Sequence, residues 1–307
     1  MSSIPRSVQV TAVLALSVFW GLNWPVQKFV LNVVEPWTLR AVLLVFGGFG
    51  CLLVAALFRQ PILVPRKDMG PMLAVGLIQG LLWNGLSGFG LAMVAAGRAA
   101  VLAFTMPIWA TVFAAIFLKE PVSLRRVIGL GLGMAGMALL LAPALDTLNA
   151  ASLGSFLMLG AAIAWAAATV IVRAVAWTVS PLAIGGWQLL IGAGPMVTAA
   201  FVFGDPSTLL DVDWVTAGAI VFAVTMPMIL CQAIFFTIVR RLPASLASMS
   251  TLLVPPFGVF FSAALIGERV GLMEMVALVL VVAAMVFTMP GFSWRPRRRR
   301  PPESYTG

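Results

Sequence analysis

Amide and indole side chains lie within long apolar runs of this 307-residue chain, where they would sit deep inside membrane helices. Trp20, Asn23, Trp24 and Gln27 are spaced i, i+3, i+4 and i+7, so one face of a helix would carry all four. A face that holds both rings and amides suits a ligand with an apolar ring and a polar end. These residues therefore indicate a binding site for a small molecule.

Two of the amides, Asn84 and Gln232, stand 148 residues apart at matched positions of an internal repeat. We expect this pair to line a substrate site. A buried amide must find hydrogen-bond partners, however, and such groups also join membrane helices to one another. For Gln79, Thr105 and Ser250, packing between helices is an equal alternative. The polar residues inside the runs are Asn23, Gln79, Asn84, Thr105, Gln188, Gln232 and Ser250.

Four tryptophans lie well inside their runs, although tryptophan usually concentrates at the two membrane interfaces. They are Trp20, Trp83, Trp109 and Trp165. An indole N–H at that depth needs a partner or a cavity. Core packing would explain any one of them, but the four together predict an aromatic-lined cavity for apolar or aromatic metabolites, with flat cations held by cation–π contact. The predicted substrate-binding residues are Trp20, Asn23, Trp24, Gln79, Trp83, Asn84, Thr105, Trp109, Trp165, Gln188, Gln232 and Ser250.

The composition places the chain in the membrane class, since 62% of its residues are hydrophobic and only 9% are charged. The chain has no histidine, which argues against zinc enzymes and histidine-based hydrolases. Cys51 and Cys231 lie in separate apolar runs and suggest neither a metal site nor a disulfide. We expect no cofactor, no metal and no catalytic residues. The net charge of +9 is explained better by membrane topology than by nucleic-acid binding.

Ten runs are long enough to cross a hydrocarbon core of about 30 Å as helices. If the N-terminus is cytoplasmic, the cytoplasmic loops and tail carry 15 Lys and Arg residues and the other side carries 4, Lys28, Arg40, Arg98 and Arg269. Both termini are therefore predicted to be cytoplasmic. The predicted spans are 8–30, 36–58, 70–93, 98–118, 125–143, 153–176, 182–204, 214–238, 245–266 and 272–290.

The run from Gly97 to Glu120 returns between Ser245 and Glu268, with Pro107 matching Pro255. Two five-helix repeats, 1–145 and 152–290, are therefore expected around a central cavity. Because five is odd, the second repeat must be inverted. The matched prolines are predicted hinges, since proline removes a backbone hydrogen bond. We expect residues 291–307 to form a disordered basic cytoplasmic tail.

The charged residues at the ends of these runs allow two interpretations. We expect Glu120 and Glu268 to form helix-end ion pairs with the arginines that follow them, Arg125 and Arg269. Arg98 is a candidate for meeting a substrate carboxylate, with a topological or lipid role as an equal alternative.

Five plus five helices, a proline in the fourth and ninth, and a glutamate ending each copy resemble the EamA-type transporters of the drug/metabolite transporter superfamily. The segments FWGLNWPVQK at Phe19–Lys28 and WNGLSGFGL at Trp83–Leu91 are similar to the YddG-type exporters of aromatic and other amino acids. The resemblance implies an all-α basket of ten transmembrane helices around one cavity, alternating access by rocking of the third and fourth and of the eighth and ninth helices, and outward movement of metabolites.

The sequence thus predicts a transporter that exports amino acids, aromatic and other apolar ones, and related metabolites. No charged residue falls in the central turns of the expected helices, which favours facilitated diffusion or exchange over proton coupling. A multidrug or nucleobase exporter is the alternative, and a membrane-embedded enzyme or a receptor fits less well. The expected partners are a small-molecule substrate and the lipid bilayer, with no nucleic acid. The expected location is a bacterial inner membrane.

Overall fold

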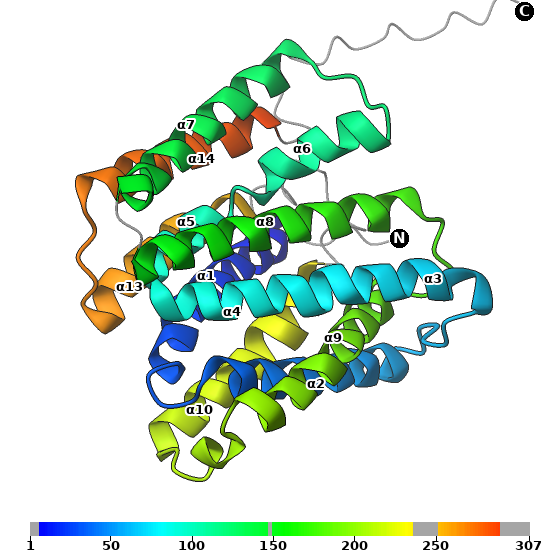
Figure 1. Cartoon of the computed structure of the whole chain (residues 1–307). Helices are drawn as coiled ribbons and strands as arrows, with labels where there is room; N and C mark the ends of the chain where they lie inside the picture. Colours follow the sequence, from blue (N-terminus) through cyan, green and yellow to red (C-terminus); the bar gives the residue numbers. More distant parts are fainter. Residues whose placement is uncertain (1–5, 147–148, 236–250, 289–307) are drawn as a thin grey trace, which may run out of the picture.

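The computed structural model describes residues 6–146, 149–235 and 251–288, and all regular structure within these ranges is helical (Figure 1). Eight helical stretches are long and apolar enough to cross a membrane, and α13 and α14 are shorter apolar helices. The first half contains α1 (Arg6–Val30), α2 (Pro36–Leu57), α3 (Arg66–Val75), the π-helix η1 (Gly76–Trp83), α4 (Asn84–Met93), α5 (Ala96–Ala103), α6 (Met106–Phe117) and α7 (Leu124–Asp146). The second half contains α8 (Ala150–Ala174), α9 (Pro181–Phe203), the 3-10 helix η2 (Pro206–Leu209), α10 (Trp214–Ala223), the π-helix η3 (Val224–Leu230), α13 (Val254–Ile266) and α14 (Leu272–Thr288).

Local capping sequences fix where several of these helices begin. Glu35 caps α2 by accepting hydrogen bonds from the backbone N–H groups of Trp37 and Thr38, and Pro36 occupies the first helical position. Ser180 and Pro181 repeat this arrangement at the start of α9. Because proline presets the helical φ angle and lacks the N–H that a helix start leaves unpaired, both spans begin close to where the sequence predicts.

Two π-helical segments occupy equivalent places in the two halves of the chain. η1 continues α3 and begins at Gly76, and η3 continues α10 and begins at Val224, 148 residues later. A π turn widens the helix and leaves backbone carbonyls without their usual α-helical partners, and such turns are frequent at functional sites. In η3 Pro227 removes a further backbone donor. The spacing is the same as that of the sequence repeat.

The predicted helix 98–118 is interrupted rather than continuous. α5 ends at Ala103, a turn follows at Phe104 and Thr105, and α6 begins at Met106 with Pro107 in its first turn. In the second half, a turn at Leu253 precedes α13, which begins at Val254 with Pro255 in its first turn. Each proline therefore lies in the first turn of a helical segment that follows a break in the chain, and its role as a hinge stays a prediction.

The helices pack into one bundle whose opposite edges are formed by different pairs (Figure 1). α7 lies along α14 at one edge, and α2 lies against α9 at the other. Close approach depends on glycine where η1 meets α9, because a Cβ added at Gly80 would lie 1.9 Å from the backbone oxygen of Gln188. The helices α1, η1, α8, α9 and η3 surround the cavity that is described below.

The ninth and tenth predicted spans are described only in part. α13 covers the second half of the expected span 245–266, and residues 245–250 lie outside the described ranges. α14 covers most of the span 272–290. The predicted basic tail also lies outside the described residues. The count of ten transmembrane helices therefore stays a prediction, whereas the all-helical, multi-pass architecture is confirmed.

Candidate functional site

A cavity of about 110 Å³ lies in the middle of the bundle and is bordered by residues from both halves of the chain. Its walls come from α1, η1, the start of α4, α8, α9 and η3, and from the first residues of α6 and α13. Nine of the twelve predicted binding residues line it. The lining residues are Trp20, Asn23, Trp24, Gln79, Trp83, Asn84, Phe104, Met106, Trp165, Gln188, Leu189, Pro227, Met228, Gln232 and Val254.

Indole rings form one wall of the cavity. Trp83 on η1 and Trp165 on α8 meet edge to face, with ring centroids 4.8 Å apart and an interplanar angle of 69°. Trp20 on α1 donates its Nε1–H to the carbonyl oxygen of Pro227 at 3.3 Å. That bond ties α1 of the first half to the π-helix of the second. The rings are therefore fixed by contacts between the halves and present an aromatic surface to the cavity.

The amide side chains around the cavity differ in the number of hydrogen bonds that they form. Asn84 is almost fully buried and donates its Nδ2 to the carbonyl oxygens of Gln79 and Gly80, both at 3.0 Å. This bond satisfies carbonyls at the end of η1 and is a structural role. The Oδ1 atom of Asn84, in contrast, is buried without a partner among the described residues. The structure thus shows the packing role of Asn84, and its substrate-binding role stays a prediction.

Three glutamine side chains on the cavity wall make no hydrogen bond with any residue that the structure describes. They come from three different elements: Gln79 from η1, Gln188 from α9 and Gln232 from the α-helical residues that follow η3. Asn23 is partly engaged, since its Oδ1 accepts a bond from Gln27 Nε2 at 2.8 Å. Free amides facing an internal space can donate to and accept from a ligand.

Three predicted binding residues are not part of this cavity. Thr105 is fully buried, and its hydroxyl donates to the carbonyl oxygen of Leu102 at 2.7 Å, so it stabilises the turn between α5 and α6. Trp109 packs elsewhere on α6, with its buried Nε1 lacking a partner among the described residues. Ser250 lies outside the described residues. Thr105 and Trp109 therefore lie outside the cavity, although the neighbouring residues Phe104 and Met106 line it.

Several apolar residues that the sequence did not single out also line the cavity. Met106 and Val254 are the first residues of α6 and α13, so both chain breaks border the cavity. Their spacing of 148 residues is the repeat spacing, which was the available signal. Pro227, which has no repeat partner, lines the cavity and accepts the bond from Trp20.

Two charged side chains hold the junction between α4 and α5 from opposite sides. Lys28 on α1 donates to the carbonyl oxygens of Leu91 and Ala92 at 2.9 and 2.8 Å, at the C-terminal end of α4. Glu268, just after α13, accepts bonds from the backbone N–H groups of Ala96 and Gly97 at 2.7 and 3.0 Å, at the N-terminal end of α5. We call this arrangement the Lys28–Glu268 clasp. Each charge complements the helix dipole it meets.

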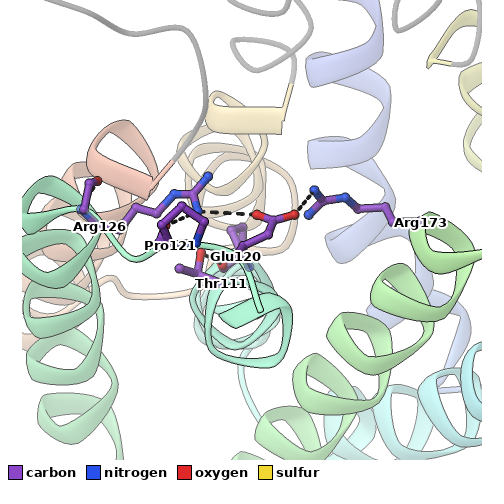
Figure 2. Close-up of polar contacts among 7 residues, drawn as sticks. Thr111, Glu120, Pro121, Arg126 and Arg173 are labelled. Carbon is purple, nitrogen blue, oxygen red and sulfur yellow. Dashed lines mark hydrogen bonds and ion pairs between the residues drawn. The ribbon is translucent and has the colours of Figure 1, made fainter. Parts of the chain in front are cut away.

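Glu120 occupies the repeat position that matches Glu268, but its partners differ. Its carboxylate lies between two arginines, Arg126 on α7 at 3.4 Å and Arg173 on α8 at 2.5 Å (Figure 2). The expected ion pair therefore forms with Arg126 and Arg173 instead of Arg125. Arg269 is likewise not the partner of Glu268 among the described contacts. The arginine predicted to meet a substrate, Arg98, is paired with Glu274 at 3.3 Å.

The lining of the cavity consists of indole rings, amides and apolar side chains. None of the described residues that line the cavity carries a charge. Aromatic walls with a few polar groups are typical of small-molecule sites. A multi-pass helical bundle with such a cavity at its centre, bordered by both halves of the chain, defines a membrane transporter of small molecules.

Comparison with known proteins identifies the family. The EamA-like transporter family matches residues 8–142 and again 152–289, and the chain belongs to this family. Among its relatives, the uncharacterized transporter YvbV of Bacillus subtilis is 27% identical over 287 residues, 93% of this chain and 92% of the relative. A probable amino-acid metabolite efflux pump of Escherichia coli is 23% identical over 289 residues, 92% of this chain and 95% of the relative.

A solved crystal structure supports the fold. It aligns with a TM-score of 0.61 and 18% sequence identity, over 92% of this chain and 96% of the solved chain. At this identity the likeness concerns the fold alone. The sequence resemblance to EamA-type transporters is confirmed by the family match.

Proposed function

We propose that this transporter exports amino acids with aromatic or apolar side chains, and related metabolites, through the central cavity. The observation that carries the proposal is the combination of paired indoles, Trp83 and Trp165, with the unbonded amides of Gln79, Gln188 and Gln232 around one space. Rings bind an apolar side chain, and amides bind the polar end of the molecule. Relatives in Escherichia coli and Salmonella typhimurium are named as probable amino-acid metabolite efflux pumps, which supports the same substrate class.

The cavity must widen for a whole substrate. Its volume of about 110 Å³ is below the roughly 150 Å³ of a protein cavity that accepts benzene, and an aromatic amino acid is larger. The chain breaks before Pro107 and Pro255 are the elements best placed to allow widening, because both border the cavity and have few helical hydrogen bonds to lose. In this proposal the α5–α6 and α13 segments turn about these breaks during alternating access.

Replacement of each proline by alanine tests the hinges. Pro107→Ala and Pro255→Ala are expected to leave expression and folding intact but to lower flux, because alanine, unlike proline, allows the helix to continue across the break and to stiffen it. Efflux from cells or proteoliposomes measures the effect. Unchanged flux in both variants would show that the breaks do not act as hinges.

We further propose that export is facilitative or by exchange. The uncharged lining offers no carboxylate that could carry a proton or sodium ion through the cavity. Proteoliposomes loaded with radiolabelled amino acid should release it at the same rate with and without a pH gradient. A strict requirement for the gradient would contradict this mechanism.

The substrate class is tested by competition. Efflux of preloaded radiolabelled phenylalanine is measured while a panel of amino acids, purines and cationic dyes competes. Amino acids are expected to compete best. If only dyes or purines compete, the chain is a multidrug or nucleobase exporter instead.

The location we propose is a bacterial inner membrane with both termini in the cytoplasm. The excess of Lys and Arg in alternate loops supports this orientation. It places the Lys28–Glu268 clasp at the outer side and Glu120 with Arg126 and Arg173 at the cytoplasmic side. Protease or thiol-labelling accessibility of tags at each end would decide the orientation.

A further inference from the structure

Arg40 is the one basic residue among those described whose side chain is buried in the bundle, with 3% of its surface exposed. It is the fifth residue of α2, about 6 Å along the helix from Pro36. A long basic side chain near a helix end usually extends to the membrane surface and keeps its charge in water. At 3% exposure Arg40 does not do so. In the sequence, Arg40 is only one of the four basic residues on the predicted outer side.

No partner for this charge occurs in the part of the chain that the structure describes. Arg40 forms no hydrogen bond or ion pair there, and its Nε atom is buried and unpartnered. The carboxylate closest in sequence, Glu35, is engaged by Trp37 and Thr38 at the start of α2. The other buried or half-buried cations near this end are paired: Lys28 with backbone carbonyls and Arg98 with Glu274.

A buried cation without a counter-charge costs several kcal/mol, and inside a membrane such a residue is a candidate functional group. The fold makes room for it. A Cβ added at Gly88 on α4 would lie 2.5 Å from Arg40 Nε and 3.0 Å from its Cγ, so the arginine crosses from α2 to α4 over a glycine. Only a residue without a side chain leaves this path open.

Arg40 and the neighbouring Ala41 lie close to residues that are next to the cavity lining or part of it. Gly88 lies one helical turn, about 6 Å, beyond Asn84, whose unpartnered Oδ1 belongs to a cavity-lining residue. Ala41, next to Arg40, packs in the same core cluster as the lining residue Leu189. Where Arg40 crosses α4 it therefore lies about one helical turn from the cavity-lining Asn84, toward the side that the charge pattern predicts to face outward.

The cavity itself offers an amino acid no positive group. A carboxylate that enters it would lose water and gain only amide donors, with no positive charge on the protein to pair with it. An arginine one turn away could supply the missing charge through two parallel N–H bonds, the geometry that guanidinium and carboxylate share.

We propose that Arg40 is an anion-binding residue of the transport path, which takes the carboxylate of the substrate as the cavity widens toward the α4 end of the bundle. This inference rests on the proposed export of amino acids and adds that the substrate must carry a carboxylate. The side chain of the substrate then stays against the indoles while its carboxylate moves from the amides to Arg40.

The test compares three ligands that share a ring and differ in charge. They are phenylalanine, phenethylamine, which lacks the carboxylate, and benzoate, which keeps a carboxylate but lacks both the amine and the two carbons that separate ring and carboxylate. Binding to the purified protein is followed by its tryptophan fluorescence. Arg40→Gln is expected to weaken phenylalanine and benzoate about 30-fold, the size expected when one partner of a buried charge pair is lost, and to leave phenethylamine within about twofold. The melting temperature should not fall, since the variant removes an unpaired buried charge.

A second variant keeps the arginine but displaces it. Gly88→Ala places a methyl group against Arg40 and should weaken the two carboxylates selectively. Gly85→Ala on the same helix is the matched control, because its Cβ would meet only the terminal methyl of Met196, at 2.7 Å. It should change none of the three affinities by more than about twofold.

Two results for Arg40→Gln would overturn the inference: equal weakening of all three ligands, or unchanged binding of phenylalanine and benzoate. A wild-type protein that binds neither phenylalanine nor benzoate would overturn it as well. Failure of the proposed function gives a different result. If wild type binds benzoate in an Arg40-dependent way but neither binds nor exports phenylalanine, the anion site stands and amino-acid export does not.

Discussion

The Lys28–Glu268 clasp yields a quantitative prediction for Glu268→Gln. The carboxylate accepts two backbone N–H groups, those of Ala96 at 2.7 Å and Gly97 at 3.0 Å, which are the first two residues of α5. Glutamine keeps one acceptor oxygen and loses the charge, so one bond disappears and the other becomes a neutral bond. Hydrogen bonds to charged groups contribute about 1.5–3 kcal/mol and neutral ones about 0.5–1.5 kcal/mol. The difference between two charged bonds and one neutral bond is about 1.5–5.5 kcal/mol. We take about 2 kcal/mol, near the lower end, because removing a helix cap costs about 0.5–2 kcal/mol.

A loss of about 2 kcal/mol corresponds to roughly a 30-fold larger population of states in which the start of α5 is released. Hydrogen–deuterium exchange with mass spectrometry measures this population directly at the amides of Ala96 and Gly97. In Glu268→Gln these amides should exchange about 30-fold faster than in wild type. Exchange in the middle of α2 should stay unchanged, because neither Lys28 nor Glu268 forms a described hydrogen bond with α2.

Glu274→Gln is the matched control. It breaks the ion pair with Arg98, whose side chains are 24% and 18% exposed, near the same end of the bundle. An ion pair of this kind contributes less than about 1 kcal/mol, so exchange at Ala96 and Gly97 should rise by less than about fivefold. Unchanged exchange in Glu268→Gln, or the same increase in both variants, would refute the assignment of the clasp to Glu268.

Further substitutions separate binding from structure. Gln232→Ala should lower amino-acid efflux about tenfold without a change in melting temperature, because the amide of Gln232 bonds to no described residue. Asn84→Ala should lower efflux and also cost about 1–3 kcal/mol of stability, because two η1 carbonyls lose their hydrogen-bond donor. Efflux and thermal melting in detergent distinguish the two, and a stability loss in Gln232→Ala would contradict the assignment. Gly80→Ala should destabilise the protein by about 1–3 kcal/mol, because the added Cβ would lie 1.9 Å from the carbonyl oxygen of Gln188. Gly194→Ala is the control and should leave stability unchanged, because its Cβ would meet nothing within 4 Å. Equal melting temperatures of the two variants would disprove the close contact at Gly80.

Local signals in the sequence determined the membrane class, the approximate helix positions and the family. Apolar run length and capping residues such as Glu35 and Ser180 act within a few turns of chain, so they can be read without knowing the fold. The helical spacing of Trp20, Asn23 and Trp24 likewise put them on one face, and all three line the cavity. The repeat supplied Asn84 and Gln232 as a pair.

Only the tertiary structure decided which polar groups are free and which charges are paired, because those states depend on helices far apart in sequence. Thr105 bonds to its own turn, whereas Gln188 faces the cavity, although both are polar residues within apolar runs. Glu268 holds α5 across the bundle, and Arg40 is buried without a counter-charge, although its position in sequence suggested a residue at the membrane surface. Burial and pairing result from packing between the two halves, which no local pattern of residues encodes.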